Sequence, residues 1–194
     1  MFMPRPDYEL SDSAKIQLLM DERDIRNVLA RDCRAKARCD AELMAACYHD
    51  DAFIHQMPFF DGFARDVVPH MADQMRAAAE MMHYCYPQIL IELDGDIART
   101  ESLNWSAKRF HDRAENGDVI MGIHGGRLID RFERRNRQWR IVERWYHHEW
   151  GYFQQVPPMT TNIGPYGPHT EPQAEGVGPF SFSRDSNDLS YSVF

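Results

Sequence analysis

The sequence lacks the features that mark several common classes of protein. No apolar run approaches the ~18 residues that a membrane span needs, and residues Met1 to Asp7 contain no apolar stretch typical of a signal peptide. We therefore expect a cytoplasmic protein that does not enter a membrane. The net charge of −8 argues against nucleic-acid binding, which favours basic surfaces.

The motifs of several catalytic classes are also missing. The sequence has no Walker loop, no GxGxxG sequence before a helix and no GxSxG nucleophile elbow. The four cysteines show no CxxC spacing, so we expect them to be reduced and packed rather than bridged or catalytic. His147 and Glu149 are placed to share a strand face, but no third ligand accompanies them, so the sequence predicts no metal site.

Helical periodicity dominates the first part of the chain. Apolar residues recur at spacings of three and four after Asp12 and Ser13, either of which can cap a helix. Asp40 is a second candidate cap, and Pro69 falls where the first turn of a helix tolerates proline. The pattern predicts helices over 14–36, 40–47 and 65–82, with a short strand over 52–57.

From His83 onward the apolar period changes to two, which predicts strands. Turn sequences rich in Asp, Asn and Gly separate them, and the Gly125–Gly126 pair predicts a bulge or bend. Helices followed by a long antiparallel meander predict an α+β fold, in which a strongly curved sheet forms a cone covered by three N-terminal helices. The predicted strands span 83–93, 97–111, 118–136 and 139–153.

We expect one domain with two extensions. Residues 1–11 form an N-terminal arm, residues 12–153 the domain and residues 154–194 a C-terminal extension rich in proline and glycine. This extension is either a flexible tail or a strap that crosses a neighbouring subunit or the mouth of the cone.

Several short segments, taken in order, resemble the SnoaL-like branch of the nuclear-transport-factor-2-like superfamily. The resemblance implies a cone-shaped α+β barrel. Its enzymes include dehydratases, a dehydrochlorinase, polyketide cyclases and diarylpropane lyases, and they work mostly without a metal or organic cofactor. The resembling segments are Asp24–Leu29, Cys47–Ala52, His83–Tyr84, Leu93–Ala98, Gly125–Arg134 and Gln138–Ile141.

The resemblance also implies catalytic residues. Catalytic members pair a histidine, at the position of His83, with an aspartate late in the first long helix. An arginine at the position of Arg144 lines their pocket. Here the aspartate position holds Ala37, so the pair is incomplete, and Asp32 or Asp40 is the alternative acid. We expect His83 and Arg144 to share the largest enclosed pocket, and Asp32 to lie near His83 or to pair with Arg144.

Each of these residues also has a purely structural explanation. His83 fits a satisfied core position as well as a general base, although an imidazole titrating near ~6.5 suits a base at neutral pH. Arg144 inside a cone must pair with an acid or bind an anion. The candidate substrate-binding residues are Tyr48, Tyr84, Tyr86, Asn104, Trp105 and Tyr146. The tyrosines are equally explained by packing, and at most one of Asn104 and Trp105 faces the interior.

Our leading hypothesis is a cofactor-independent lyase that eliminates water or formaldehyde from a small aromatic alcohol, such as a lignin-derived diarylpropane. His83 acts as general base, and Arg144 or a tyrosine stabilises the developing negative charge. The alternatives are a non-catalytic small subunit of a ring-hydroxylating dioxygenase, another ligand-binding module, or a polyketide cyclase or isomerase. We also expect a homodimer or homotrimer formed through the convex sheet face, with Trp145 and Trp150 on opposite faces of the last strand.

Overall fold

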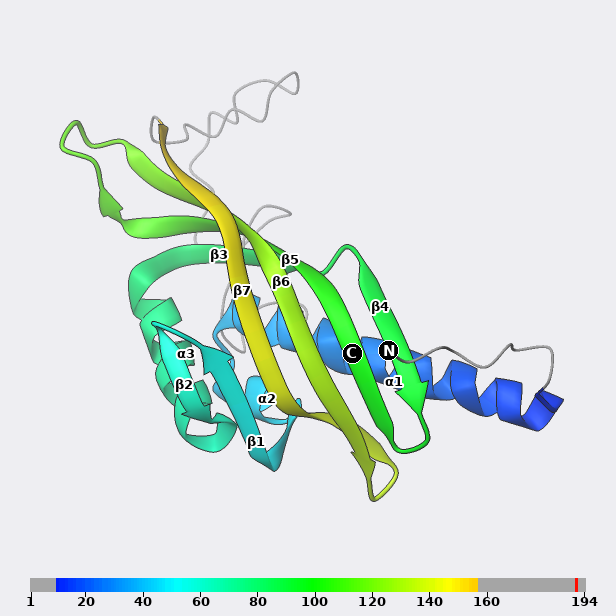
Figure 1. Ribbon diagram of the computed structural model, residues 1–194. Coiled ribbons are helices and arrows are strands. Elements are labelled where there is room, and N and C mark those ends of the chain that lie inside the picture. Colours follow the sequence, from blue (N-terminus) through cyan, green and yellow to red (C-terminus); the bar gives the residue numbers. More distant parts are fainter. Residues whose placement is uncertain (1–9, 157–190, 192–194) are drawn as a thin grey trace.

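The computed structural model describes residues 10–156 and Tyr191. Most of the expected N-terminal arm and of the expected C-terminal extension lies outside these residues. Within the described part, no helix is both long and apolar enough to cross a membrane. The elements are α1 (Asp12–Arg38), α2 (Ala41–Ala45), β1 (Tyr48–Gln56), β2 (Phe60–Phe63), α3 (Ala64–Ala78), β3 (Ala79–Cys85), β4 (Ile89–Asp94), β5 (Ile97–Arg113), β6 (Val119–Arg135) and β7 (Gln138–Val156) (Figure 1).

The strands form one curved, open sheet, which confirms the α+β fold. Their order is β2-β1-β7-β6-β5-β3, and β4 also pairs with β5. The strand pairs are antiparallel except for β1 and β7, which run parallel. The expected purely antiparallel sheet is therefore wrong at this one pair. β1 and β7 are far apart in the chain, so no hairpin turn signals their pairing.

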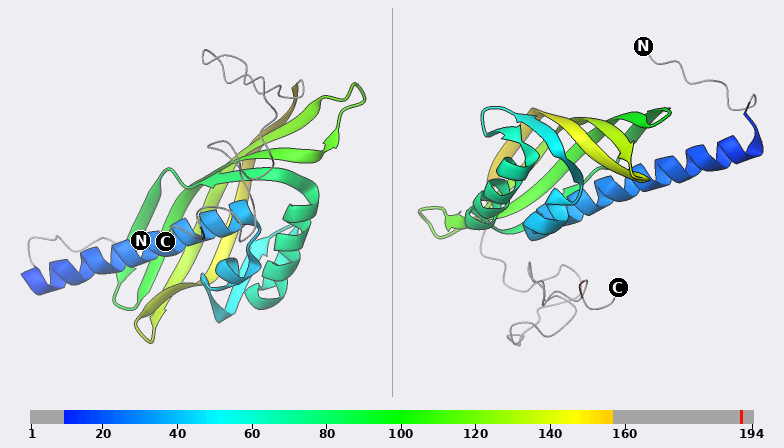
Figure 2. Two further views of the ribbon diagram at one scale, coloured as in Figure 1. Left: turned by 180° about the vertical axis from the view of Figure 1, so that it is seen from behind. Right: turned by 90° about the horizontal axis from the view of Figure 1, so that it is seen from below.

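Helix α1 crosses the concave, inner face of the sheet (Figure 2). Its N-cap is Ser11, whose hydroxyl accepts a hydrogen bond from the backbone N–H of Ala14, and Cys39 ends it in the left-handed conformation. The stripe that starts with Ile25, Val28 and Leu29 is buried in the main hydrophobic cluster. Asp32 and Lys36 continue this buried side, so the helix brings an ionic pair into the interior.

The largest difference between the predicted and the observed secondary structure is at the C-terminal end of α3. The sequence predicted a helix up to residue 82 and a strand over 83–93. In the structure the helix ends at Ala78, and β3 pairs with the segment of β5 from Trp105 to Phe110. This long-range ladder outweighs the local helix preference of an Ala-Glu-Met-Met sequence. Pro87, which has no N–H to donate to a ladder, then separates β3 from β4.

The Gly125–Gly126 pair does form a bulge, because the β6–β7 register shifts between these two residues. On one side of the bulge Trp145 lies opposite Ile129, and on the other side Trp150 lies opposite Gly125. A Cβ atom at Gly125 would lie 2.2 Å from the Trp150 ring, so only glycine leaves room for this indole. The bulge adds one residue to β7, so beyond it the odd- and even-numbered side chains exchange faces. Both tryptophans therefore lie on the outer face. The expectation of opposite faces is wrong.

Candidate functional site

The inner face of the sheet consists of rows, because ladder partners on neighbouring strands point to the same side. Thr100 of β5, Asp130 of β6 and Arg144 of β7 make one such row. The next rows of the inner face each contain one residue of β5, and these residues are Ser102, Asn104, Ser106 and Lys108. Thr100, Ser102, Asn104 and Ser106 are all buried. A strip of polar side chains therefore runs along the interior of the sheet.

Arg144 is the largest fully buried side chain of the described residues. Its Nε and Nη2 donate to the two carboxylate oxygens of Asp130, at 2.7 Å and 2.8 Å. Its Nη1 donates to Asp32 Oδ2 at 2.7 Å and to the Tyr48 hydroxyl at 2.8 Å. The guanidinium thus joins α1, β1, β6 and β7 in one polar cluster, and the expected pairing of Arg144 with Asp32 is present.

Asp32 is fully buried, and its two carboxylate oxygens have different environments. Oδ2 accepts hydrogen bonds from Arg144 at 2.7 Å, from Lys36 Nζ at 3.0 Å and from the Tyr86 hydroxyl at 2.6 Å. Oδ1 has no hydrogen-bond partner among the described residues. Burial alone raises the pKa of Asp32, but the charges of Arg144 and Lys36 and these hydrogen bonds outweigh it and hold the pKa well below its usual range. Asp32 is therefore ionised and has one unused acceptor oxygen in the interior.

Two tyrosines complete the cluster around Asp32. The Tyr86 hydroxyl donates to Asp32 and accepts a hydrogen bond from Lys36 Nζ at 2.9 Å. The Tyr48 hydroxyl accepts from Arg144, which leaves its own proton available for donation. Burial raises the pKa of both phenols well above the ordinary value. Both tyrosines are therefore protonated hydrogen-bond donors at neutral pH.

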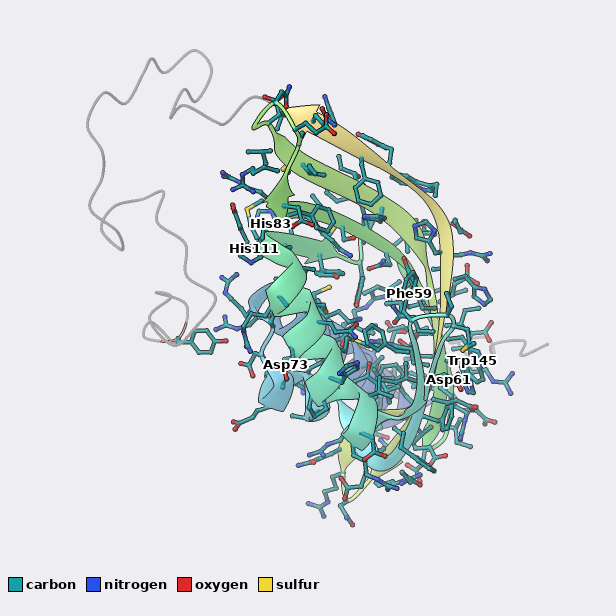
Figure 3. The ribbon with its side chains drawn as sticks, turned by 90° about the vertical axis from the view of Figure 1, so that its left-hand side faces the viewer. Phe59, Asp61, Asp73, His83, His111 and Trp145 are labelled. Carbon is teal, nitrogen blue, oxygen red and sulfur yellow. The ribbon has the colours of Figure 1, made fainter. Side chains whose placement is uncertain are left out.

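His83 does not reach this cluster. It lies in the middle of β3 rather than at a strand start, and its side chain is exposed. Its ladder partner is Ala107, whereas the inward-facing Tyr84 pairs with the buried Ser106. Figure 3 shows His83 beyond the end of α3. The expectation that His83 and Arg144 share an enclosed pocket is wrong, because His83 is on the outward side of its strand.

The remaining predicted residues divide between the two faces. Asn104 is buried on the inner face and hydrogen-bonds to the Tyr146 hydroxyl, whereas Trp105 is 41% exposed on the outer face. Tyr84 is half-buried on the inner face. Asp40 is outside the cluster, because one oxygen caps α2 by accepting from the Leu43 N–H and the other accepts from the Tyr191 hydroxyl.

Sequence reasoning missed three charged residues of the inner face, namely Lys36, Asp130 and Lys108. The i, i+4 spacing of Asp32 and Lys36 was a usable signal, because such pairs meet on one side of a helix. Asp130 had no comparable signal, since its partner comes from another strand. Lysine itself is rare here. The chain has 22 Lys and Arg residues, of which only Lys15, Lys36 and Lys108 are lysines.

The thiols and the metal-binding residues give no competing centre in the described part. Burial and the charge of Asp32 raise the pKa of Cys33 and of Cys47 to about 12, so neither thiol is an activated nucleophile. Within residues 10–156 and Tyr191, no three His, Cys, Asp or Glu side chains are grouped to hold a metal ion. Glu149, next to the histidine pair of β7, instead forms an ion pair with Arg127.

Comparison with known proteins identifies relatives of this chain. A sequence profile of the SnoaL-like domain family matches residues 17–145, whereas none of the curated proteins matches the sequence. A solved structure from Novosphingobium aromaticivorans, described as a scytalone dehydratase, aligns with a TM-score of 0.63 at 16% identity. That alignment covers 75% of this chain and 97% of the other.

Two further structures are similar. Hexachlorocyclohexane dehydrochlorinase LinA type 3, from Novosphingobium barchaimii, aligns with a TM-score of 0.59 at 13% identity and covers 75% of this chain and 96% of its own. A protein described as an aromatic ring hydroxylase, from Novosphingobium aromaticivorans, aligns with a TM-score of 0.59 at 10% identity. It covers 71% of this chain and 94% of its own. At these identities the similarity concerns the fold.

Proposed function

This chain belongs to the SnoaL-like domain family, and on that premise we propose that it is a cofactor-independent lyase acting on a small aromatic alcohol. The reaction is the elimination of water or formaldehyde, with a lignin-derived diarylpropane diol as the representative substrate. Two of the structural relatives are described as a dehydratase and a dehydrochlorinase, which are both elimination enzymes. Their descriptions support this reaction class.

The unpartnered Oδ1 of Asp32 is the observation that carries the proposal. An elimination needs a group that accepts a proton and a donor that stabilises the leaving oxygen. Asp32 supplies an ionised carboxylate whose Oδ2 is fully engaged and whose Oδ1 is free. A buried, unsatisfied carboxylate oxygen is costly, and a substrate hydroxyl that donates to it removes that cost.

Tyr48 is suited to the opposite role. Its hydroxyl accepts from Arg144 at 2.8 Å, so its proton can be directed to a substrate oxygen. In the proposed reaction, Asp32 Oδ1 takes the proton of the primary hydroxyl, the bond to the hydroxymethyl carbon breaks, and formaldehyde leaves. The released electron pair forms the carbon–carbon double bond as the neighbouring benzylic hydroxyl departs with the proton of Tyr48, as water. Arg144 stabilises the phenolate that Tyr48 becomes when it gives up its proton. Proton exchange with solvent then restores Asp32 and Tyr48.

This assignment transfers the role of base from His83 to Asp32. His83 is exposed on the outward side of β3, whereas Asp32 is buried beside the donors that the reaction requires. Lys36 and Tyr86 act as positioning residues, because both hold Oδ2 of Asp32 and so direct Oδ1 toward the substrate.

The test measures formaldehyde and the diaryl alkene released from a diarylpropane diol by the purified full chain. Asp32→Asn and Tyr48→Phe are each expected to lower turnover by at least ~10²-fold, and circular dichroism establishes that each variant is folded. His83→Ala is the matched control and is expected to leave turnover unchanged. A folded Asp32→Asn variant with full turnover, or an inactive His83→Ala variant, contradicts the assignment.

The same experiment separates the alternative functions. A wild-type protein that turns over no diarylpropane diol, and that co-purifies with an iron protein, would be a small subunit of a ring-hydroxylating dioxygenase. Turnover of a polyketide substrate without formaldehyde release would identify a cyclase or isomerase that uses the same residues.

A further inference from the structure

Lys108 is a cation on the inner face of the sheet. It lies on β5 between Met82 of β3 and Gly122 of β6, its two ladder partners. Its side chain is half-buried, and no described residue forms an ion pair or hydrogen bond with it. Burial, followed by the charge of Lys36, lowers its pKa.

The charges of this face do not balance. Arg144 and Lys36 are neutralised by Asp130 and Asp32, with which they form ion pairs at distances of 2.7 to 3.0 Å. Tyr48 and Tyr86 stay neutral because their pKa values are raised. Lys108 therefore adds a positive charge that no described acid compensates. An uncompensated, partly buried charge is costly, and a ligand with one anionic group would offset that cost.

The surroundings of Lys108 suit an aromatic ring that carries such a group. Phe110 follows Lys108 on the same face and contacts Phe153, with ring centroids 5.6 Å apart, and His124 meets Phe153 edge-on at 5.5 Å. A Cβ atom at Gly122 would lie 2.8 Å from the Phe110 ring and 2.9 Å from His124 Nε2, so glycine allows both rings to lie over β6. An open depression beyond Lys108 is lined by these two phenylalanines together with Asp112, Ile120 and Gln155. Ligand pockets typically combine aromatic walls with one or a few polar groups of this kind.

Two buried hydroxyls of β5 also lack partners, one in the row of Asp130 and Arg144 and one in the next row toward Lys108. Thr100 is 3% exposed and Ser102 is fully buried. No described residue hydrogen-bonds to their hydroxyl oxygens. Together with Asp32 Oδ1 and His124 Nε2, they give the inner face four buried polar atoms without a partner among the described residues. Buried polar groups are almost always hydrogen-bonded, so a polar ligand on this face would supply the partners that these atoms lack.

From these observations we propose that the inner face binds a ligand with an anionic oxygen on an aromatic group. Lys108 pairs with that anion. Asp32 Oδ1 and the hydroxyls of Thr100 and Ser102 bind the polar middle of the ligand. This inference rests on the proposed function, because it takes the Asp32 cluster as the reaction centre. It narrows the substrate class to aromatic alcohols whose remote ring carries a carboxylate or a phenolate. Lys108 is a binding residue, and the reacting atoms lie at Asp32 and Tyr48.

The test uses calorimetric titration of the full chain with 4-propylbenzoate, whose carboxylate is attached to the ring, and with its uncharged analogue, 4-propylbenzamide. The wild type is expected to bind the carboxylate at least ~10-fold more tightly than the amide, which corresponds to ~1.4 kcal/mol. Lys108→Met is expected to abolish this preference by weakening only the carboxylate, and Lys108→Arg to retain it. Lys15→Met, at an exposed lysine of α1, is the matched control and keeps the wild-type preference. A second pair, 4-nitrophenol at mildly alkaline pH and 4-nitroanisole, distinguishes a phenolate from a carboxylate as the preferred anion.

Each outcome decides the proposal. A wild type without preference for either anion, or a Lys108→Met variant that keeps the preference, overturns it. Loss of the preference in Lys108→Met, together with no turnover of any diarylpropane diol, supports the anion site and refutes the lyase. Equal turnover of a neutral diol and of its ring-carboxylated analogue, in the wild type and in Lys108→Met alike, refutes the anion site and leaves the lyase intact.

Discussion

Replacement of Arg144 by methionine tests the interpretation of the interior most directly. Arg144 is 2% exposed and contributes both hydrogen bonds by which Asp130 is held. Methionine keeps much of the volume but removes the charge, which leaves Asp130 buried without a partner among the described residues. Asp32 keeps Lys36 and Tyr86, so most of the cost arises at Asp130.

Removing one member of a buried ion pair costs ~3–5 kcal/mol, because the remaining charge is left uncompensated. A domain is stable by only ~5–15 kcal/mol in total, so Arg144→Met is expected to lose a large share of the free energy of unfolding. The measurement is urea unfolding followed by circular dichroism, with similar m-values for wild type and variant. The double variant Asp130→Asn with Arg144→Met is expected to recover part of the loss, because no buried charge is then left unpaired.

Arg127→Met is the matched control for this experiment. Arg127 also lies on the sheet, but its ion pair with Glu149 is exposed, and an exposed pair contributes little. This variant is expected to unfold at the same urea concentration as the wild type. If Arg144→Met loses less than ~1 kcal/mol, or if the double variant is less stable than the single one, Arg144 does not neutralise a buried Asp130, and the electrostatic description of the cluster is wrong.

Two further predictions follow from the same geometry. Because the pKa of Asp32 is lowered on folding, its ionised form contributes stability that is complete above the unfolded value of ~3.9 and is lost as the pH falls toward the folded value. The stability of wild type relative to Asp32→Asn should therefore shrink below about pH 4 in acid-unfolding measurements, and a constant difference down to pH 3 would contradict it. We also propose a homodimer or homotrimer through the outer sheet face, where Trp105, Trp150 and Tyr152 are 41%, 46% and 49% exposed. Light scattering should show a dimer or trimer for the wild type and a smaller species for Trp150→Glu, and a monomeric wild type would refute the interface.

The sequence by itself was enough for most of the secondary structure. The helix α1 and the strands β5, β6 and β7 follow from periodicity and turn residues, which are local properties of the chain. The glycine pair at 125–126 was also correctly interpreted as a bulge. The prediction failed at residues 79–82, where pairing with β5 outweighs a local helix preference, and at the parallel pairing of β1 with β7, for which no local signal exists.

The site required the tertiary structure because its residues come from distant parts of the chain. Asp32 and Arg144 are separated by 112 positions and Asp32 and Tyr86 by 54, yet each pair meets at hydrogen-bond distance. The sequence identified Asp32, Arg144, Tyr48 and Tyr86 as candidates but favoured His83, whose orientation depends on where β3 begins and on its register with β5. A strand alternates its side chains between two faces, so the ladder decides which residues enter the interior. That register turned His83 and Trp105 outward, and it placed Lys108 beside an inner face that no sequence pattern had marked.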